Sequence, residues 1–378
     1  MNILIIGHYG GENFGDEAML YSILSRLTKI EDAAITVVTK PRKKFYFSEK
    51  EVTYVLPSLF NVFRECLKTD VLILGGGTHF HDGYNKQRLK NHLVYLLKIL
   101  LIYLMFFLSG KKIYQLGVGY GPFYGRLIRV LSAVSVKLAT FTLVRDHASY
   151  KWLTNLGIPL HNTDVSFDLV GLHPLFADKP DSRLTVGVTY TQWTGVSLTS
   201  FAYNELTYND EFWTGHFFSS IEDLYKKYDL HIKIFVFRGG ERESDEPLSR
   251  QLYNLLKKID ERRVKLIEYS EETSPFIEEI KSCASFIATR YHSALLAYLC
   301  ECRLFFIPYH EKLISLSEDI GLNDKAVFRV EKSQLPDLPN RLEEFILNEE
   351  NNYSASLEVS EAFRKSKKNL SVFGIDSK

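Results

Sequence analysis

The chain has 378 residues, of which 46% are hydrophobic and 24% are charged. This composition is typical of a globular protein, and the length predicts two domains rather than one. Lys and Arg together number 46, as do Asp and Glu, so the formal net charge is zero. A neutral chain has no overall field that would hold it on nucleic acid, so any anion site must be local.

The first half alternates strand-like and helix-like segments. Residues 3–6 form a continuous apolar run, as expected for a strand buried on both faces, and residues 18–27 have helical spacing. Further strands are predicted at residues 34–38, 70–74, 112–116 and 141–144. Several of these segments end in glycine-rich turns. Strand, glycine-rich turn and helix in repetition predict an open parallel sheet.

A second series follows a predicted linker at residues 171–182. Strands are predicted at residues 184–190, 231–237, 264–269, 286–289 and 303–307, with a helix at 217–228. We therefore predict an α/β fold with two doubly wound, Rossmann-like domains that face a cleft. The predicted N-terminal domain spans 1–172, the C-terminal domain 183–346, and a polar tail, helical or loose, spans 347–378.

Residues 92–110 form an apolar segment with Lys98 as its only interior charge and basic residues on both sides. A buried crossover helix, a helix lying in the membrane interface and a spanning helix are the three interpretations. A span would interrupt the predicted sheet, and helices that are apolar all round are usually core, so the pattern favours a packed helix. Peripheral membrane contact through 92–110 stays open as the alternative.

The cysteines and the N-terminus point to a cytoplasmic protein, with the inner face of the membrane as an open variant. Cys300 and Cys302 do not have the spacing of a zinc pair, so we expect buried free thiols. A signal peptide has a basic region before its apolar run, and the N-terminal apolar run of this chain has none. His79, His81 and Asp82 lack a further ligand cluster, so no metal site is predicted. The sequence carries no signal of oligomeric state.

Two arginine signatures stand at the predicted ends of strands. Arg145 lies in Leu143-Val144-Arg145-Asp146-His147-Ala148-Ser149, and Arg290 and His292 lie in Ala288-Thr289-Arg290-Tyr291-His292-Ser293-Ala294. Arginine suits planar anions, and histidine transfers protons near neutral pH. A surface pair of Arg145 with Asp146 and a hydrogen-bonded core role for His292 are the structural alternatives. The adjacent Arg290 favours a functional site there.

The glycine turns supply further candidates. In the first turn, Asn13 and Asp16 either cap the following helix and complement its dipole or hold sugar hydroxyls. The turn Gly75-Gly76-Gly77 is interpreted as a strand end that leaves room for a ligand. Lys312 also follows a predicted strand, where by itself it would be a solvated lysine.

Together these motifs resemble the polysaccharide pyruvyl transferase family. The matching residues are Gly7, Asn13-Phe14-Gly15-Asp16-Glu17, Gly75-Gly76-Gly77, Gly117-Val118-Gly119, Gly121-Pro122, Arg145-Asp146, Ser149, Asp164-Val165, Arg290-Tyr291-His292, Tyr309 and Lys312. The resemblance implies a glycosyltransferase fold B and transfer of the pyruvyl group of phosphoenolpyruvate onto two hydroxyls of a sugar. The product would be a cyclic ketal on a cell-surface polysaccharide, such as an exopolysaccharide or capsule, or on its lipid-linked precursor.

The resemblance also implies residue roles. His292 would be the catalytic acid or base, and Arg145, Arg290 and Lys312 would bind the donor. The acceptor side would involve Asn13, Asp16 and the triple glycine at 75–77, or these residues would be structural. Phosphoenolpyruvate is the donor substrate, and no cofactor is implied.

Two alternatives remain at this point. One is a nucleotide-sugar glycosyltransferase of the same fold, with Glu301 or Glu311 as weak candidates for a ribose contact. The other is a non-catalytic glycan-binding protein that uses its aromatic residues. The aromatic candidates are Tyr190, Trp193, Tyr203 and Trp213, which would otherwise pack in the core or cover a loop.

Overall fold

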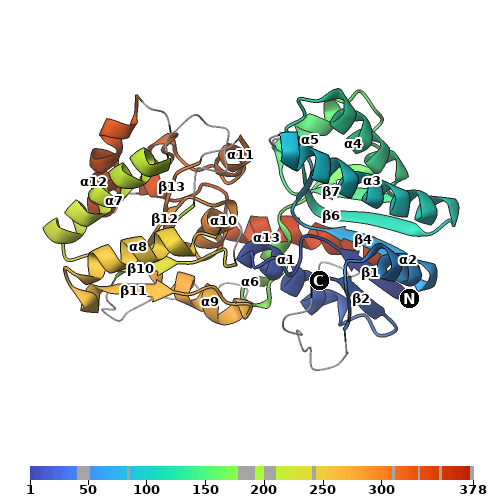
Figure 1. The fold of residues 1–378 in the computed structure, drawn as a ribbon, viewed down its shortest axis with the longest axis horizontal. Helices are drawn as coiled ribbons and strands as arrows, with labels where there is room; N and C mark the ends of the chain where they lie inside the picture. The colour runs from blue at the N-terminus through green and yellow to red at the C-terminus, as the bar shows by residue number, and fades with distance from the viewer. Residues whose placement is uncertain are drawn as a thin grey trace. The chain divides into compact units, whose positions relative to one another are not determined.

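The computed structural model describes residues 1–40, 52–82, 86–177, 192–199, 210–240, 244–308, 311–330, 333–348 and 351–374. The chain forms two compact units, each built on a parallel sheet (Figure 1). The first unit contains Met1–Gly11, Asp16–Asp178 and Ser360–Lys378, and the second contains Glu12–Gly15 and Lys179–Val359. These units differ from the predicted domains in two places, the first turn and the C-terminus.

The sheet of the first unit has the order β3-β2-β1-β4-β6-β7-β8, with β5 beside β6. Its strands are β1 (Asn2–Ile6), β2 (Ala34–Val38), β3 (Thr53–Val55), β4 (Val71–Gly75), β5 (Thr78–Phe80), β6 (Lys112–Tyr120), β7 (Phe141–Val144) and β8 (Thr163–Val165). All neighbours run parallel, and β4 is buried along its whole length, as its apolar sequence predicts. The three strands that the sequence did not predict, β3, β5 and β8, have three residues each, too few to show a periodicity.

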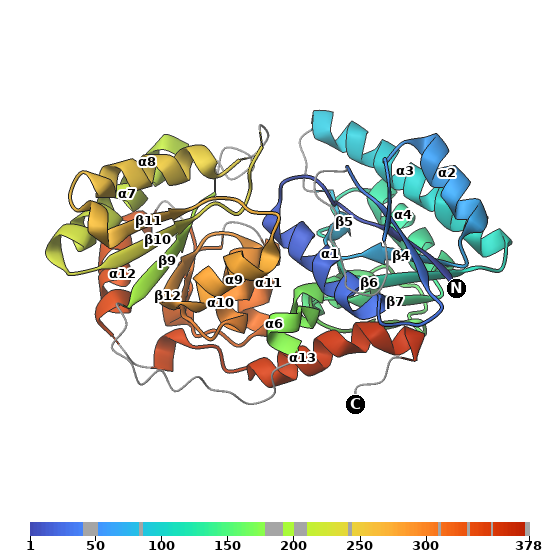
Figure 2. The same ribbon diagram turned by 90° about the horizontal axis from the view of Figure 1, so that it is seen from below.

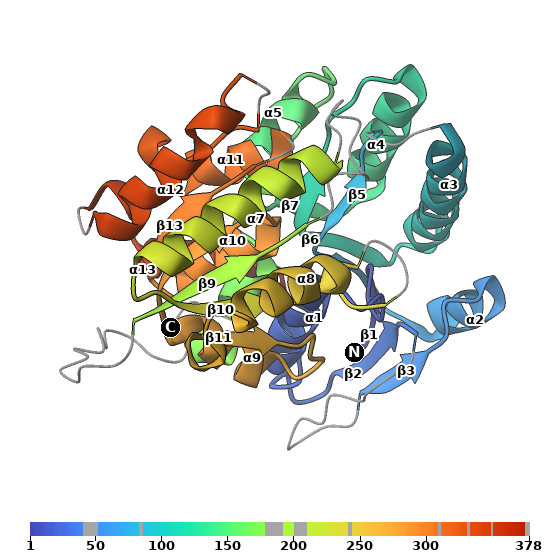
Figure 3. The same cartoon turned by 60° about the vertical axis from the view of Figure 1, so that its left-hand side comes forward.

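Helices cover both faces of this sheet. They are α1 (Phe14–Leu27), α2 (Leu59–Lys68), α3 (Lys86–Leu108), α4 (Arg126–Leu138), α5 (His147–Thr154), α6 (Pro174–Ala177) and α13 (Val359–Lys367), with 3-10 turns at Leu169–Leu172 and Lys368–Phe373. Side chains of α2, α3, α4 and α5 share one apolar core with the sheet. Figure 2 shows α1 and α13 on the opposite face. Within the first group, α3 packs against both α2 and α4 (Figure 3).

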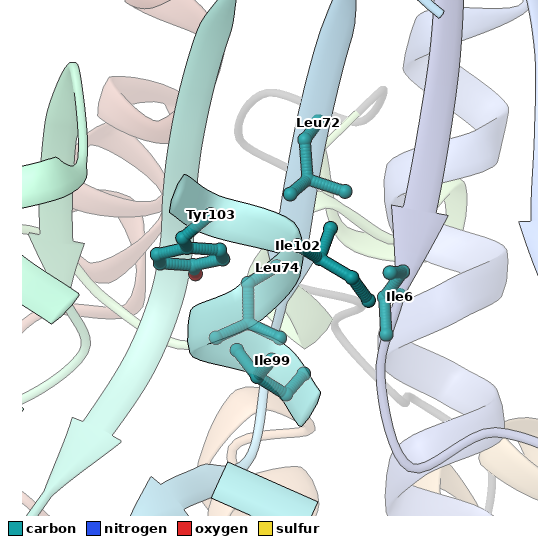
Figure 4. A pocket seen from close by; sticks show the side chains of 6 residues that line it. All are labelled: Ile6, Leu72, Leu74, Ile99, Ile102 and Tyr103. Atoms are coloured by element: carbon teal, nitrogen blue, oxygen red, sulfur yellow. The ribbon is translucent and has the colours of Figure 1, made fainter. Parts of the chain in front are cut away.

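The long apolar segment is a helix packed on the sheet, as the sequence favoured. Three side chains of α3 lie against the sheet (Figure 4), where Ile99, Ile102 and Tyr103 contact Leu72 and Leu74 of β4 and Ile6 of β1. These side chains leave no room for a water molecule between them. Tyr103 is 1% exposed. This contact belongs to the core and is not a ligand pocket. The opposite face of α3, with Leu97 and Leu101, is exposed.

The C-terminal residues correct the prediction of a separate tail at 347–378. Residues 360–378 belong to the first unit, where α13 and the turn after it bind the backbone beyond β8. The hydroxyl of Ser366 donates to the carbonyl of Asp168 at 3.1 Å, and the amide of Asn369 donates to the carbonyl of Phe167 at 3.1 Å. Lys368 donates to the carbonyl of Val165 at 2.9 Å. The helical alternative for this tail is confirmed by α13, and its polar side chains bond to backbone of the first unit.

The second unit has a five-stranded parallel sheet with the order β11-β10-β9-β12-β13. Its strands are β9 (Trp193–Ser197), β10 (His231–Phe235), β11 (Val264–Ile267), β12 (Cys283–Ala288) and β13 (Arg303–Phe306). Its helices are α7 (Asp210–Lys227), α8 (Glu246–Lys257), α9 (Thr273–Lys281), α10 (Tyr291–Leu299), α11 (Glu311–Asp319) and α12 (Leu338–Leu347), with 3-10 turns at Glu261–Arg263, Asp324–Ala326, Leu335–Asp337 and Asn351–Tyr353. Four of its strands match predicted segments.

The central strand of this sheet, β9, was not predicted. The predicted strand at 184–190 lies outside the described residues. The strand β9 follows it in the sequence and contains Thr194, Gly195 and Ser197, which interrupt its apolar character. Among the aromatic candidates for sugar stacking, Trp213 is 3% exposed and stacks on Phe217, so it is core. Trp193 lies under the ammonium groups of two lysines, while Tyr190 and Tyr203 lie outside the described residues.

Residues 12–15 of the first turn belong to the second unit, which corrects their placement in an N-terminal domain at 1–172. The amide of Phe14 donates to the carbonyl of Phe237 at 2.9 Å, and the amide of Gly239 donates to the carbonyl of Glu12 at 3.0 Å. Phe14 is fully buried, and its ring stacks on Phe276 with centroids 4.1 Å apart. A short strand-like pairing and one aromatic anchor thus fix this turn beyond the end of β10.

Phe14→Ala is expected to lower the free energy of unfolding by about 3–5 kcal/mol, because it removes a fully buried ring and leaves a cavity. Urea denaturation followed by circular dichroism measures the change. The control is Leu347→Ala, which trims a side chain that is 56% exposed and should cost less than about 0.5 kcal/mol. Equal effects for the two variants would show that the Phe14 anchor does not stabilise the second unit.

Candidate active site

Arg290 and His292 lie at the carboxyl end of β12, where α10 begins. Arg290 occupies the N-cap position in an extended conformation, and its amide donates to the hydroxyl of Ser293 at 3.1 Å. The Ser197 hydroxyl donates to Ser293 at 2.7 Å and accepts the amide of Thr289 at 3.1 Å. Hydroxyls from β9 and α10 therefore fix the backbone that carries the Arg-x-His motif. This is the edge of a parallel sheet where ligands usually bind.

A buried carboxylate orients the guanidinium of Arg290. Nη1 of Arg290 lies 3.2 Å from Oδ2 of Asp245, whose side chain is fully buried. Asp245 also accepts the amides of Phe237 at 3.2 Å and Arg238 at 2.8 Å, so β10 and β12 share this carboxylate. Burial raises the pKa of Asp245 to about 6, although Arg290 and the amides oppose the rise.

Asp245 was not among the sequence candidates. It follows Gly239-Gly240 and the charged run Glu241-Arg242-Glu243, which has the composition of a solvated loop. The available signal was that this run also follows a strand, β10, in the way that Arg290 follows β12. Only the fold shows that Asp245, just after this run, turns inward.

His292 lies against Gly15, a residue of the N-terminal motif. A Cβ atom on residue 15 would lie 1.9 Å from Nδ1 of His292 and 2.2 Å from Cγ, a contact that no side chain allows. Gly15 lies in α1, so its backbone conformation does not itself require glycine. The glycine is needed because the imidazole occupies the space of a side chain. The structure thus brings the N-terminal motif together with the Arg-x-His motif, although more than half of the chain separates them.

The other N-terminal candidates flank this contact. Asn13 precedes α1 and forms a β-bridge with Arg238, and Asp16 and Glu17 stand in the first turn of the helix. Glu17 accepts the amide of Gly10 at 2.8 Å, so this carboxylate closes the turn. Asp16 lies in the helix turn where an acidic side chain complements the dipole. Its second interpretation, a contact with sugar hydroxyls, stays a prediction.

Arg145 belongs to the first unit and is 5% exposed. Its guanidinium lies 3.3 Å from Asp146 and 3.3 Å from Asp168, and it donates to the hydroxyl of Thr78 at 3.1 Å. Two carboxylates therefore balance the charge of Arg145. Gly119 makes room for the cluster, because a Cβ atom there would lie 2.7 Å from Oγ1 of Thr78. The surface pair considered from the sequence is replaced by a buried network at the ends of β6 and β7.

The triple glycine after β4 accommodates neighbouring side chains. A Cβ atom on Gly75 would lie 2.6 Å from the hydroxyl of Tyr9, and one on Gly76 would lie 2.4 Å from Sδ of Met19. The Tyr9 hydroxyl donates to the carbonyl of Gly75 at 2.7 Å, and burial raises the pKa of Tyr9. Gly77 has a left-handed φ of 73°, and its nearest neighbours would be 3.7 Å away. The space expected for a ligand at Gly75 and Gly76 is thus filled by protein.

The histidine and aspartate after this turn have structural contacts. Nε2 of His79 donates to the carbonyl of Gly76 at 2.6 Å, and Nδ1 accepts the Tyr95 hydroxyl at 2.8 Å. Burial lowers the pKa of His79, so its ring is neutral. Asp82 accepts the amide of Tyr124 at 2.8 Å. Within the described part of the chain, no group of three or more His, Cys, Asp or Glu side chains has the arrangement of a metal site.

Lys312 lies in α11, and its side chain is outside the described residues. The predicted site residues therefore fall into two sets. Asn13, Arg290 and His292 belong to the second unit, as does Lys312 by its backbone. Asp16, Arg145 and the triple glycine belong to the first unit.

The sequence pattern of the polysaccharide pyruvyl transferase family matches residues 13–311, which is most of the chain. The chain belongs to this family. The match begins at Asn13 and reaches α11, so it includes the contact between Gly15 and His292 and the Arg145 cluster. The resemblance inferred from the motifs is confirmed. Among curated proteins, no sequence matches this pyruvyl transferase.

Solved structures share its fold at low sequence identity. The UDP-GlcNAc 2-epimerase from Methanocaldococcus jannaschii is 12% identical, with a TM-score of 0.58 and 100% of both chains covered. A putative UDP-N-acetylglucosamine 2-epimerase from Listeria monocytogenes is 10% identical, with a TM-score of 0.60, and covers 99% of this chain and 97% of its own. The UDP-GlcNAc 2-epimerase from Neisseria meningitidis is 13% identical, with a TM-score of 0.58 and coverages of 98% and 100%. These similarities support two Rossmann-like domains of the glycosyltransferase B type.

Gly15→Ala is expected to lower the transferase rate at least about tenfold, because the new methyl group displaces the His292 ring by more than an ångström. Alanine favours the helix, so the unfolding free energy should change little through α1 itself. The matched control is Gly11→Ala in the same turn, where the nearest atom would be 3.7 Å away. Similar rates for both variants would show that the position of His292 is not critical.

The raised pKa of Asp245 predicts a pH dependence of stability. Between about pH 4 and pH 6 the folded state holds a proton that the unfolded state has lost, so stability falls as pH rises through this window. Asp245→Asn cannot ionise. The unfolding free energy of the wild type minus that of Asp245→Asn should therefore fall by about 2–3 kcal/mol from pH 4 to pH 7. Urea denaturation at both pH values measures it, and a constant difference would contradict the raised pKa.

Proposed function

We propose that this polysaccharide pyruvyl transferase moves the pyruvyl group of phosphoenolpyruvate onto two hydroxyls of a sugar. The acceptor would belong to a cell-surface polysaccharide or its lipid-linked precursor. The observation that supports the proposal most is the His292 ring against Gly15, with Arg290 anchored on Asp245 two residues away. A cation and a proton-transfer group are thus held together at the carboxyl end of a parallel sheet.

The proposed reaction balances without an added cofactor. The first sugar hydroxyl adds to the enol carbon of phosphoenolpyruvate, and a proton goes to the methylene carbon, which becomes a methyl group. The bond to the phosphate oxygen then breaks, and the second hydroxyl takes the vacated position to close the ketal. The proton of the second hydroxyl leaves with the phosphate. The products are a cyclic pyruvate ketal and inorganic phosphate.

His292 would transfer the protons of this sequence. A positioned histidine can deliver a proton to the methylene carbon and remove one from a hydroxyl, each with an effect of about 100-fold or more on rate. The contact with Gly15 fixes the ring plane, and the hydroxyl-bonded start of α10 fixes its backbone. A fixed ring keeps its nitrogen atoms in reach of the reacting atoms.

Arg290 would bind the donor and stabilise the leaving phosphate. A guanidinium has five N–H donors, and among the described residues one of them, on Nη1, donates to Asp245. The remaining donors suit a carboxylate or a phosphate, both of which phosphoenolpyruvate carries. Because Asp245 is buried beneath the arginine, the guanidinium is oriented before the donor arrives.

The remaining candidates keep their proposed roles. Lys312 and Arg145 are proposed donor-binding residues, and Asn13, Asp16 and the triple glycine are proposed for the acceptor side or for structure. Arg145 brings less net positive charge than its sequence suggested, because Asp146 and Asp168 balance it. Its loss should therefore also disturb Thr78 and the glycine turns that pack on it.

Phosphate release and product mass test the proposal. With phosphoenolpyruvate and a panel of sugar acceptors, His292→Ala should lower kcat about 100-fold or more. Arg290→Lys should raise KM for phosphoenolpyruvate about tenfold, because lysine keeps the charge but loses the fork. The control is His161→Ala, which removes an exposed histidine of the first unit and should leave both constants unchanged.

Two outcomes would contradict the proposal. One is full activity in His292→Ala or Arg290→Lys. The other is a thermal shift by nucleotide sugars with none by phosphoenolpyruvate, since a ligand stabilises the protein that binds it. The second outcome would favour a nucleotide-sugar glycosyltransferase of the same fold. Binding of glycan without phosphate release or pyruvylated product would favour a non-catalytic glycan-binding protein.

A further inference from the structure

The face of α3 that points away from the core is apolar and exposed. Leu97, Leu101 and Leu104 follow one another at spacings of four and three, so they lie on one side of the helix. Leu97 is 55% exposed and Leu101 is 54% exposed, whereas Ile99 and Tyr103 on the other side are nearly inaccessible. The run Leu89–Leu108 is long and apolar enough to cross a bilayer, yet one side of it is part of the core.

The neighbouring helices extend this surface. Both α2 and α4 pack beside α3 on the same face of the sheet (Figure 3). The exposed apolar side chains of the three helices are Leu59, Phe60, Phe63 and Leu67 of α2, Val94, Leu97, Leu101, Leu104, Phe107 and Leu108 of α3, and Leu127, Val130 and Val134 of α4. We call this set the α2–α3–α4 face. Exposed apolar side chains gathered on neighbouring helices often mark an interaction site.

The contrast with the rest of the molecule supports a specific role for this face. Among the described residues of the second unit, the exposed large hydrophobic side chains comprise Leu347 alone. The exposed apolar surface is therefore concentrated on one side of one unit. Singly scattered hydrophobic residues need no explanation, but a concentration across three adjacent helices does.

The charge on these helices is strongly one-sided. The chain as a whole is neutral, yet α3 and α4 contain no acidic residue and α2 contains one, Glu65, which pairs with Arg64 and Lys68. The basic residues of the three helices whose side chains the structure describes are Arg64 and Lys68 of α2, Lys90 and Lys98 of α3, and Arg126, Arg129 and Lys137 of α4. An apolar surface with a basic surround is complementary to anionic lipid headgroups.

We propose that the α2–α3–α4 face binds an anionic phospholipid bilayer, with its apolar side chains in the boundary between headgroups and acyl chains. Lys98, exposed on α3, would extend its charge to the headgroups along its aliphatic stem. A second copy of the chain fits less well. Two such faces would bring like charges together, with Glu65 as the one acidic residue to balance them.

A spanning α3 is disfavoured by the core of the first unit. Leu96, Ile99, Tyr103 and Phe106 pack against the sheet side, and they are at most 3% exposed. Insertion of the helix across a bilayer would remove all of these side chains from the core and so destabilise the first unit. The proposed contact leaves them in place. It does not depend on the pyruvyl transfer reaction or on the residues assigned to it.

Flotation of the full chain with vesicles tests this contact. Vesicles of phosphatidylcholine with phosphatidylglycerol should carry the protein upward, and pure phosphatidylcholine vesicles should bind it at least about tenfold more weakly. The variant Phe60→Gln/Leu97→Gln/Leu101→Gln should lose at least about tenfold in affinity for the anionic vesicles. Lys98→Gln and Arg126→Gln should each lose about fivefold at low salt.

The controls separate lipid binding from folding and from catalysis. Leu347→Gln changes an exposed leucine of the second unit and should bind vesicles like the wild type. The triple variant should keep its thermal midpoint and its rate of phosphate release with a water-soluble acceptor. These results would support the contact even if the proposed donor proved wrong.

Three results would overturn the proposal. The first is equal vesicle binding by the wild type and the triple variant. The second is no binding to anionic vesicles, together with a lipid-free dimer that the triple variant abolishes, which would show that a second copy covers the face. The third is membrane association that alkaline carbonate does not release, which would show that a helix spans the bilayer.

Discussion

The contact between Gly15 and His292 is the constraint on which the proposed chemistry depends. The imidazole occupies the volume that a side chain at residue 15 would need, so the backbone at Gly15 limits where the ring can lie. The backbone at residue 15 is in turn fixed by the pairing of residues 12–14 beyond β10 and by the buried ring of Phe14. A ring held by main chain and core has little freedom to move, which suits the proton transfer proposed for His292.

Both arginine signatures are held by buried carboxylates at strand ends, but with different charge balance. Arg290 faces one carboxylate, Asp245, whereas Arg145 faces two, Asp146 and Asp168. Removing a guanidinium from water is costly unless it is paired, so each arginine needs such a partner to stand in a folded core. The first arrangement leaves donors for a ligand, and the second organises the surrounding turns.

The first unit has two very different helical surfaces. The inner side of α3 completes the core with Ile99, Ile102 and Tyr103, and its outer side joins α2 and α4 in an exposed apolar face with basic surroundings. One helix can serve both because its apolar residues run around its whole circumference. Such a sequence satisfies a packed core and leaves apolar surface for a second contact, which a strictly amphipathic helix would not.

The sequence determined the class of the fold and the family, and it supplied Arg290 and His292 as candidate site residues. Continuous apolar runs that end in glycine turns predict parallel strands buried on both faces. The residue types of the Arg-x-His motif indicate anion binding by the arginine and proton transfer by the histidine. Short strands such as β5 and β8 have too few residues to show a pattern. The strand β9 contains Thr194, Gly195 and Ser197, so it lacks the continuous apolar run that predicts a buried strand. The polar sequence of α13 likewise gave no sign that it packs on the first unit.

Only the tertiary structure decided which partners complete the site. Asp245 looks like one charge in a solvated loop, and Gly15 looks like a glycine chosen for its turn. Their roles come from contacts across large sequence separations, with Arg290 in one case and His292 in the other. Periodicity and composition report on neighbours along the chain. The role of a buried carboxylate or of a missing Cβ atom depends on which side chains the fold places beside it.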